Sequence, residues 1–362
     1  MMNEFLNMTV LWAALAFVAV LIVMPFAIRL AVKCGFVDVP GGRKAHESPV
    51  PLVGGLVIFP LFMILNTLSG APLDAVWPLY AGMMLLLGVG AVDDKCGLSP
   101  RIKFAAQIAA AVLIVFPGEA SVSSLGYLFG GEEFKLYYMT IPFSLIATVL
   151  LINAINLLDG LDGLSGGLGV LIFAMFLLAV HLSGDFAHVT DLPILIAVLL
   201  GFLWFNMRHR WRKRASVFIG DAGSLTLGLL IAWYAMHLGD YKGGVIEPIT
   251  VAWILALPIF DTCAQFARRI KEKRHPFSPD ANHFHHHFRN AGLSVTASTG
   301  TVLLIVLVLS LVGVLGVYYG APLPVLTWSW IVLILVHIAV SLKPVRYQNA
   351  IKAITKYCRP SA

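Results

Sequence analysis

Long runs of apolar residues alternate along this chain with short polar segments. A helix needs about 20 apolar residues to cross the hydrocarbon core of a bilayer, which is about 30 Å thick. Runs of that length predict helices, because backbone N–H and C=O groups cannot remain unpaired in lipid. The pattern therefore predicts an all-α polytopic integral membrane protein of about 11 transmembrane helices, with residues 1–362 forming a single domain. The runs lie near residues 8–30, 51–69, 73–92, 102–118, 140–158, 164–183, 190–207, 221–239, 247–267, 297–319 and 322–342.

The polar segments between these runs are charged asymmetrically. With eleven spans the two termini lie on opposite sides, and every Lys and Arg except Lys135 and Lys242 falls on the side of the C-terminus. Basic loops stay in the cytoplasm, so we expect an outside N-terminus and a cytoplasmic C-terminus. A composition of 59% hydrophobic and 12% charged residues excludes an ordinary water-soluble domain. Basic loops beside anionic lipid explain the net charge of +6, so we expect the lipid bilayer as a partner and no nucleic acid.

Acidic residues gather where apolar runs meet the cytoplasm, and Asp221 and Asp261 are two of them. Asp93 and Asp94 are adjacent, and a site that keeps two neighbouring carboxylates ionised usually supplies a cation or uses one carboxylate as a base. The stretch LINAINLLDGLDGLSGG adds two amides and two Asp-Gly steps, at Asn153, Asn156, Asp159 and Asp162. Together these residues predict an oxygen-rich site for a hard cation. The alternatives are a charged helix stop, interhelical amide bonds and simple turns.

Two further motifs on the same side suit phosphate. FIGDAGSL opens an apolar run, so its backbone N–H groups can face a phosphate, Asp221 can hold Mg²⁺ and Phe218 can stack on a base. An ordinary Asp or Ser helix cap is the alternative. The last cytoplasmic loop combines arginines with clustered histidines, which can form charge-assisted bonds to diphosphate; a transition-metal site or a pH-sensitive loop are the alternatives. The cations of this side include Arg43, His46, Lys103, Arg268, His283, His285, His286 and His287.

Carboxylates for Mg²⁺ and cations for phosphates are what phosphoryl transfer requires, since that catalysis is mainly positioning and charge neutralisation. A site at the membrane edge favours one lipid reactant and one nucleotide-activated donor from the cytosol. A secondary transporter would place its ionisable residues near mid-membrane, and a metal-binding scaffold would explain the histidines but not the Asp pairs.

These motifs, in this order over almost the whole chain, resemble the polyprenyl-phosphate N-acetylhexosamine-1-phosphate transferases. The resemblance is to the bacterial undecaprenyl-phosphate GlcNAc-1-phosphate transferases above all, although the triple His is also similar to that of the phospho-MurNAc-pentapeptide transferases. The motifs are PVPLVGG, VDDKCGLSPRIKFAAQ, NAINLLDGLDGLSGG, VFIGDAGSL and SPDANHFHHHFRNAG.

The resemblance implies transfer of N-acetylhexosamine 1-phosphate from a UDP-sugar, with UDP-GlcNAc favoured, to undecaprenyl phosphate. The products would be undecaprenyl-diphospho-sugar and UMP, in the first membrane step of O-antigen or other surface glycan synthesis. UDP-QuiNAc, UDP-FucNAc and UDP-MurNAc-pentapeptide are the alternative donors. It further implies Mg²⁺, with Mn²⁺ as the alternative, a cytoplasmic-face site in the bacterial inner membrane, and a homodimer.

The resemblance also implies roles for residues of this chain. Expected metal ligands are Asp221, Asp93 and Asp94. Expected catalytic residues are Asp93, Asp94, Asp159, Asp162, His285 and His286. Expected substrate-binding residues are Arg43, His46, Lys103, Asn153, Asn156, Asn206, Phe218, Arg268, His283 and His287. Direct displacement and a two-step route through an aspartyl-phosphate both remain open.

Overall fold

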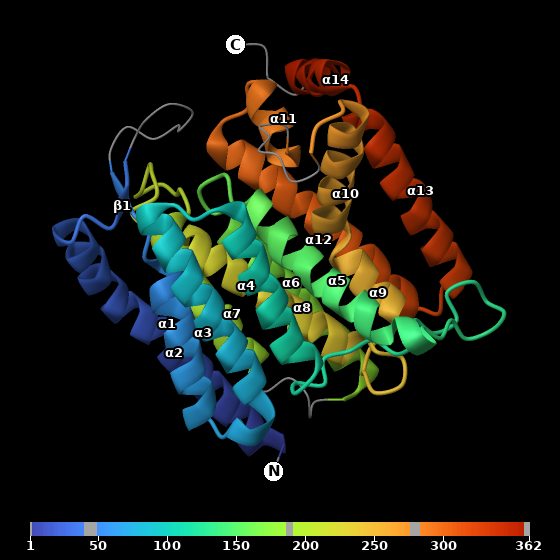
Figure 1. Cartoon of the computed structure of the whole chain (residues 1–362), viewed down its shortest axis with the longest axis horizontal. Helices are drawn as coiled ribbons and strands as arrows, with labels where there is room; N and C mark the ends of the chain where they lie inside the picture. Colours follow the sequence, from blue (N-terminus) through green and yellow to red (C-terminus); the bar gives the residue numbers. More distant parts are fainter. Residues whose placement is uncertain (1, 40–48, 186–190, 276–282, 358–362) are drawn as a thin grey trace.

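The computed structural model describes residues 2–39, 49–185, 191–275 and 283–357, and this part of the chain is mostly helical (Figure 1). Its two short strands, β1 (Val37–Asp38) and β2 (Val50–Pro51), pair antiparallel. A 3-10 turn, η1 (Tyr137–Met139), precedes the fifth helix. The helices are α1 (Met2–Lys33), α2 (Gly54–Leu68), α3 (Leu73–Cys96), α4 (Pro100–Val115), α5 (Thr140–Leu158), α6 (Leu164–Ser183), α7 (Leu192–Asn206), α8 (Gly220–Gly239), α9 (Pro248–Ile254), α10 (Ala256–Lys271), α11 (Phe284–Asn290), α12 (Val295–Tyr318), α13 (Leu323–Ser341) and α14 (Pro344–Tyr357).

Each predicted apolar run contains a helix, and the ninth contains two, α9 and α10, which meet at a 69° bend. Among the described residues, seven helices are long and apolar enough to cross a membrane, or eight if the bent pair forms one span. The difference from eleven lies in α2 and α7, with 15 residues each, and α4, with 16. At 1.5 Å per residue these three helices reach only about 24 Å, less than the hydrocarbon thickness. The class of all-helical membrane protein is confirmed.

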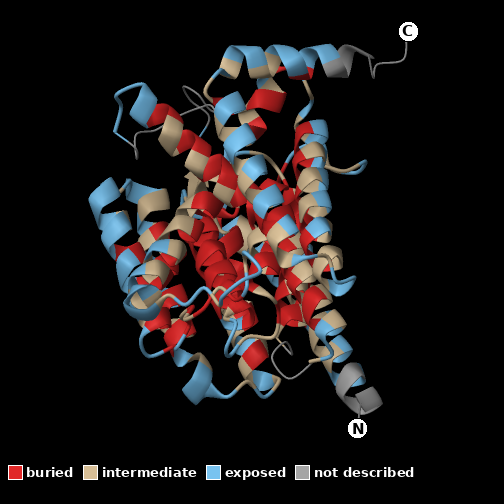
Figure 2. Ribbon diagram, turned by 90° about the vertical axis from the view of Figure 1, so that its right-hand side faces the viewer, coloured by how far each residue is buried: buried red, intermediate tan, exposed pale blue. Residues whose placement is uncertain are grey.

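Helix α8 forms the centre of the bundle and is buried along nearly its whole length (Figure 2). Helices α3 and α5 pack along it, and α2 and α6 also contact it, while α1 and α7 pack against each other and against α2. Glycines allow these close approaches: a Cβ atom on Gly228 of α8 would lie 2.6 Å from the Cα atom of Ile152 in α5. A Cβ atom on Gly55 of α2 would lie 2.2 Å from the Cα atom of Gly223. Small residues therefore let the helix backbones touch, as is common within membranes.

The outer surfaces of the peripheral helices are apolar. Large side chains such as Phe26 of α1, Leu304 of α12 and Val332 of α13 are exposed on them. Exposed apolar surface of this extent is what lipid contact requires. The outer helices therefore fit a bilayer environment.

The loop between α4 and α5 lies at the opposite end of the bundle from α14 (Figure 1). A Gly-Gly turn between alternating runs at 119–139 predicts a β-hairpin here. Three backbone bonds cross the turn, from Leu125 N–H to Phe134 O at 2.9 Å, from Phe134 N–H to Gly126 O at 2.8 Å and from Leu136 N–H to Ser123 O at 2.9 Å. Only an isolated bridge, between Ser124 and Lys135, accompanies them. The hairpin is thus confirmed as a short pairing rather than as two full strands.

Candidate active site

The ends of four helices meet on the side of the bundle that carries α14, and they bring acidic side chains from distant parts of the chain together. Lys103 Nζ, at the start of α4, lies 2.7 Å from Asp93 Oδ2 of α3 and 3.1 Å from Asp221 Oδ2 of α8. Asn156 Nδ2 of α5 donates to Asp221 Oδ1 at 3.1 Å and to Ser224 Oγ at 2.8 Å. One ammonium group is therefore shared by two carboxylates. We call Asp93, Asp94, Lys103, Asn156 and Asp221 the carboxylate cluster.

Asp94 has different hydrogen-bond partners from Asp93. Its Oδ1 atom accepts the backbone N–H of Asp221 at 2.9 Å, and its Oδ2 atom accepts that of Ala222 at 3.2 Å. The carboxylate therefore caps the start of α8 and faces the positive end of the helix dipole. Gly220 has φ +74°, and a Cβ atom there would lie 2.5 Å from Asp94 Oδ2, so this approach requires glycine.

The cap changes the expectation for FIGDAGSL. Two of the backbone N–H groups that were expected to face a phosphate are already taken by Asp94. The segment before α8 is held by the PVPLVGG motif, since Gly54 and Gly55 N–H donate to Phe218 O and Ile219 O, both at 2.9 Å. The anion at this helix start is thus a carboxylate of the protein itself. Phe218 belongs to this segment and is half-buried.

Asp159 lies in the turn between α5 and α6, near the carboxylate cluster. The pKa of the Asp159 carboxyl is raised to about 7, mainly by burial; the neighbouring carboxylates of Asp221, Asp94 and Asp162 add to the rise, and a hydrogen bond with Ser165 opposes it. A carboxyl group with such a pKa exchanges a proton near neutral pH.

The other predicted carboxylate of this turn, Asp162, is engaged elsewhere. Its Oδ2 atom accepts Arg208 Nε–H at 2.6 Å and the backbone N–H of Ala215 at 3.2 Å. Thr299 Oγ also donates to the backbone oxygen of Asp162 at 3.1 Å. These bonds tie the turn to the 207–219 loop and to α12.

Two predicted amides also form bonds within the protein. Asn153 Nδ2 donates to Gln107 Oε1 of α4 at 2.6 Å and to Val149 O at 2.8 Å. Asn206, buried at the end of α7, accepts Gly163 N–H and donates to Val217 O, both at 2.8 Å. The contact between Asn153 and Gln107 is the interhelical amide bond that the sequence left open as an alternative for this stretch.

The histidines lie on the short helix α11, which we call the histidine helix. Asp261 of α10, only 2% exposed, accepts the backbone N–H of Phe284 at 2.9 Å through Oδ1 and lies 3.0 Å from His283 Nδ1 through Oδ2. Gln265 Nε2 donates to the same carboxylate at 3.3 Å. The sequence places Asp261 among the acids at the membrane edge but predicts no role for it. An acid inside the apolar segment LPIFDT was the available signal.

His285 joins the histidine helix to the carboxylate side. A Cβ atom on Gly160 would lie 2.3 Å from His285 Nε2, so this ring rests against the turn that carries Asp159. The ring is 1% exposed, and neither of its nitrogens has a hydrogen-bond partner in the described part of the chain. Burial lowers the pKa of His285 to about 3. The expected imidazolium is therefore a neutral imidazole, which can donate one N–H to a substrate oxygen.

The remaining predicted cations surround this helix. Burial lowers the pKa of His287 to about 4, and its ring packs 4.7 Å from that of Tyr347 in α14. The His286 ring lies 4.1 Å from that of His285. Arg268, 2% exposed, donates to Gln265 and has its Nε atom 3.8 Å from Glu272 Oε1. Arg43 and His46 lie outside the described residues.

Comparison with known proteins agrees with this arrangement of motifs. Residues 76–239, which span the carboxylate cluster, match the glycosyl transferase family 4 model. The chain is 33% identical over 338 residues to the undecaprenyl-phosphate alpha-N-acetylglucosaminyl 1-phosphate transferase of Salmonella typhimurium, covering 91% of this chain and 88% of that protein. The chain belongs to glycosyl transferase family 4.

Two further family 4 relatives cover similar lengths. The Escherichia coli K12 protein of the same name is 32% identical over 343 residues, which is 92% of this chain and 88% of the relative. The probable undecaprenyl-phosphate N-acetylglucosaminyl 1-phosphate transferase of Bacillus subtilis is 33% identical over 319 residues, or 86% of each chain. The family resemblance read from the motifs is confirmed.

The carboxylates of this family 4 protein offer a partial donor set for a metal. No group of three or more His, Cys, Asp or Glu residues arranged to hold an ion occurs in the described ranges. Mg²⁺, however, typically takes one or two protein carboxylates and fills its shell with water and substrate phosphates. Asp93 and Asp221, which already share the Lys103 ammonium, could supply these two carboxylates if Mg²⁺ took the place of that ammonium. Asp94 fits it less well, because both of its oxygens accept backbone N–H groups.

Proposed function

We propose that this protein transfers GlcNAc 1-phosphate from UDP-GlcNAc to undecaprenyl phosphate, giving undecaprenyl-diphospho-GlcNAc and UMP. The observation that carries the proposal is the single ammonium of Lys103 held between Asp93 and Asp221. At such a site, a metal ion bound to the diphosphate can replace the Lys103 ammonium while the two carboxylates stay in place. The names of the relatives support the choice of sugar and lipid. The same chemistry with another UDP-N-acetylhexosamine is the alternative.

In the direct route, an oxygen of the lipid phosphate attacks the phosphorus that bears the sugar. The bond from this phosphorus to the bridging oxygen breaks, and UMP leaves with the electron pair. When bound by Asp93 and Asp221, Mg²⁺ would neutralise charge on the diphosphate. Lys103, freed from the carboxylates, would pair with the lipid phosphate, and Asp159 would take up a proton that this phosphate still carries. His285 would donate an N–H to a diphosphate oxygen.

The proposed site faces the cytoplasm of a bacterial inner membrane, with the N-terminus outside. The uneven distribution of Lys and Arg supports this orientation, because the basic 208–214 segment lies at the cluster end of the bundle through the Arg208–Asp162 pair. Undecaprenyl phosphate would then reach the cluster from the inner leaflet and UDP-GlcNAc from the cytosol.

Release of UMP by the purified full chain tests the proposal. We expect release from UDP-GlcNAc only when undecaprenyl phosphate and Mg²⁺ are both present, and loss of release on chelation with EDTA. Parallel assays with UDP-GalNAc and UDP-MurNAc-pentapeptide would assign the sugar. No UMP from any donor under these conditions would refute the proposal. Phosphate trapped covalently on the protein without lipid acceptor would instead replace direct displacement by the two-step route.

A further inference from the structure

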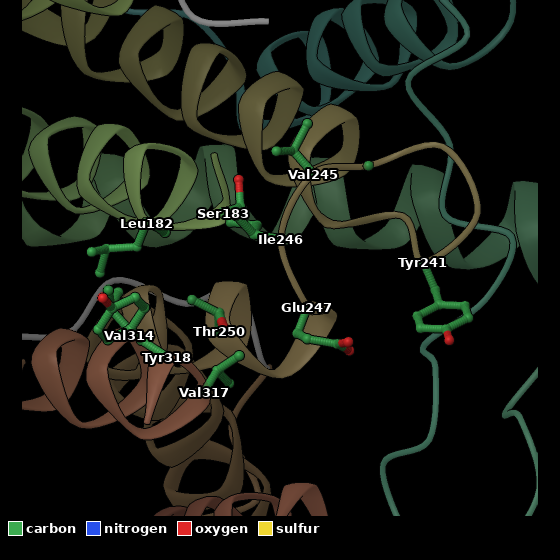
Figure 3. A pocket seen from close by; sticks show the side chains of 12 residues that line it. Leu182, Ser183, Tyr241, Val245, Ile246, Glu247, Thr250, Val314, Val317 and Tyr318 are labelled. Carbon is green, nitrogen blue, oxygen red and sulfur yellow. The ribbon is translucent and has the colours of Figure 1, made fainter. Parts of the chain in front are cut away.

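A cavity of about 490 Å³ opens at the end of the bundle opposite the carboxylate cluster. Three segments surround it: the end of α6, the loop that leads into α9, and the end of α12 (Figure 3). The cluster lies at the start of α8 and this loop follows its end, so the length of α8 separates them, about 30 Å at 1.5 Å per residue. The cavity is therefore distinct from the proposed active site.

The polar groups of this cavity are acceptors or hydroxyls. Glu247 is half-buried at its edge, and its carboxylate forms no hydrogen bond or ion pair with any residue that the structure describes. Burial raises the pKa of Glu247. Thr250 is 2% exposed, and its Oγ atom has no hydrogen-bond partner in the same part of the chain. The nearby cation Lys242 acts on Glu133 instead.

The rest of the lining is apolar and lies next to the lipid-facing surface. It includes Ala179, Leu182, Val245, Ile246, Val314 and Val317. None of the described residues that line the cavity carries a positive charge. An unpaired carboxylate in such a setting attracts a cation, and a partly desolvated one does so more strongly than one in water.

Ca²⁺ does not fit these groups. One carboxylate and one hydroxyl fall far short of the six to eight oxygens that Ca²⁺ takes. A primary ammonium fits better, because its three N–H donors match the Glu247 carboxylate and the Thr250 hydroxyl while the apolar walls receive an attached hydrocarbon. A quaternary ammonium has no N–H group to offer.

We propose that this cavity binds the primary ammonium group of an amphiphile, with Glu247 as its counter-ion and Thr250 as a hydrogen-bond acceptor. The ligand source is either an aminophospholipid of the surrounding leaflet or a free alkylammonium. Binding at this site does not require the transferase activity proposed for the other end of the molecule.

Native mass spectrometry of the detergent-purified full chain tests the proposal. The probes are phosphatidylethanolamine, phosphatidylcholine and phosphatidylglycerol of equal chain length, and dodecylammonium. We expect phosphatidylethanolamine to be retained roughly tenfold better than phosphatidylcholine, since charge-assisted hydrogen bonds are about twice as strong as neutral ones. Retention of dodecylammonium alone would assign the site to a free amphiphile. Equal retention of all three phospholipids, with no retention of dodecylammonium, would overturn the proposal.

Two variants locate the binding. Glu247→Gln keeps the shape but removes the charge, and it should weaken phosphatidylethanolamine retention roughly tenfold. Glu132→Gln, the same change at an exposed position, should leave retention unchanged. Thr250→Val should reduce retention about threefold and serves as the second test if Glu247→Gln does not fold. Wild-type retention in Glu247→Gln, or in Thr250→Val where Glu247→Gln cannot be purified, would overturn the proposal.

Discussion

The carboxylate cluster and the histidine helix meet at the turn after α5 but differ in how their polar atoms are satisfied. In the cluster, the carboxylates of Asp93, Asp94 and Asp221 all accept hydrogen bonds from the protein itself. On the histidine helix, both ring nitrogens of buried His285 lack a partner among the described residues. A buried polar group left unpaired costs about 1–3 kcal/mol. Folding therefore pairs the carboxylates of the cluster, whereas it leaves both His285 nitrogens without a partner among the described residues.

The largest effect should come from removing charge in the cluster. Asp221→Asn takes away one of the two carboxylates that share Lys103 and that would hold Mg²⁺. We expect UMP release to fall by about a thousandfold or more, in line with losing a dominant electrostatic contribution, while size-exclusion behaviour stays that of the wild type. Turnover near the wild-type rate would show that the cluster is structural.

Crowding the histidine helix should have the next largest effect. Gly160→Ala places a methyl group 2.3 Å from His285 Nε2, so the ring must move and its hydrogen bond to substrate is misplaced. We expect UMP release to fall about a hundredfold with little change in thermal stability. Gly88→Ala is the matched control, because no atom lies within 4 Å of the added Cβ, and its rate should be unchanged. Equal rates for the two variants would remove His285 from the site.

Loosening the anchor of the histidine helix should have a smaller effect. Asp261→Asn keeps an oxygen for the Phe284 N–H but loses the charge beside His283. We expect KM for the UDP-sugar to rise about tenfold with kcat nearly constant, which separates positioning from chemistry. Glu272→Gln, an exposed charge near the end of the same helix, is the control. A fall in kcat at unchanged KM would contradict a positioning role for Asp261.

The smallest effect concerns stability against pH. Because the pKa of Asp159 in the folded protein, about 7, exceeds its ordinary value of 3.8, the folded state holds the proton more tightly than the unfolded state. Stability from this group is therefore present below about pH 4 and is lost as pH rises to about 7. In Mg²⁺-free buffer, the wild type should lose up to about 2 kcal/mol more than Asp159→Asn between pH 5 and 7. Parallel denaturation midpoints for both proteins would contradict the raised pKa.

Sequence reasoning selected most of the polar residues that meet at this site but not what each one contacts. Asp159 and Asp162 look equivalent in the motif, yet one lies beside the cluster and the other pairs with Arg208. Asn153 and Asn156 share a helix face, but only Asn156 reaches Asp221. Within each pair, the two residues are of the same type and lie three positions apart in the same motif. Their partners come from distant parts of the chain, so local sequence cannot distinguish them.

The sequence by itself determined the helical membrane class, the positions of the apolar runs and the family, because run length and motif order are read along a single chain. Only the tertiary structure decided that Asp94 caps a helix through the N–H of Asp221, 127 residues later, and that Asp261 anchors the histidines. The physical reason is packing: glycines such as Gly90 and Gly220 bring backbones and carboxylates within bonding distance, and that approach exists only when the helices are assembled.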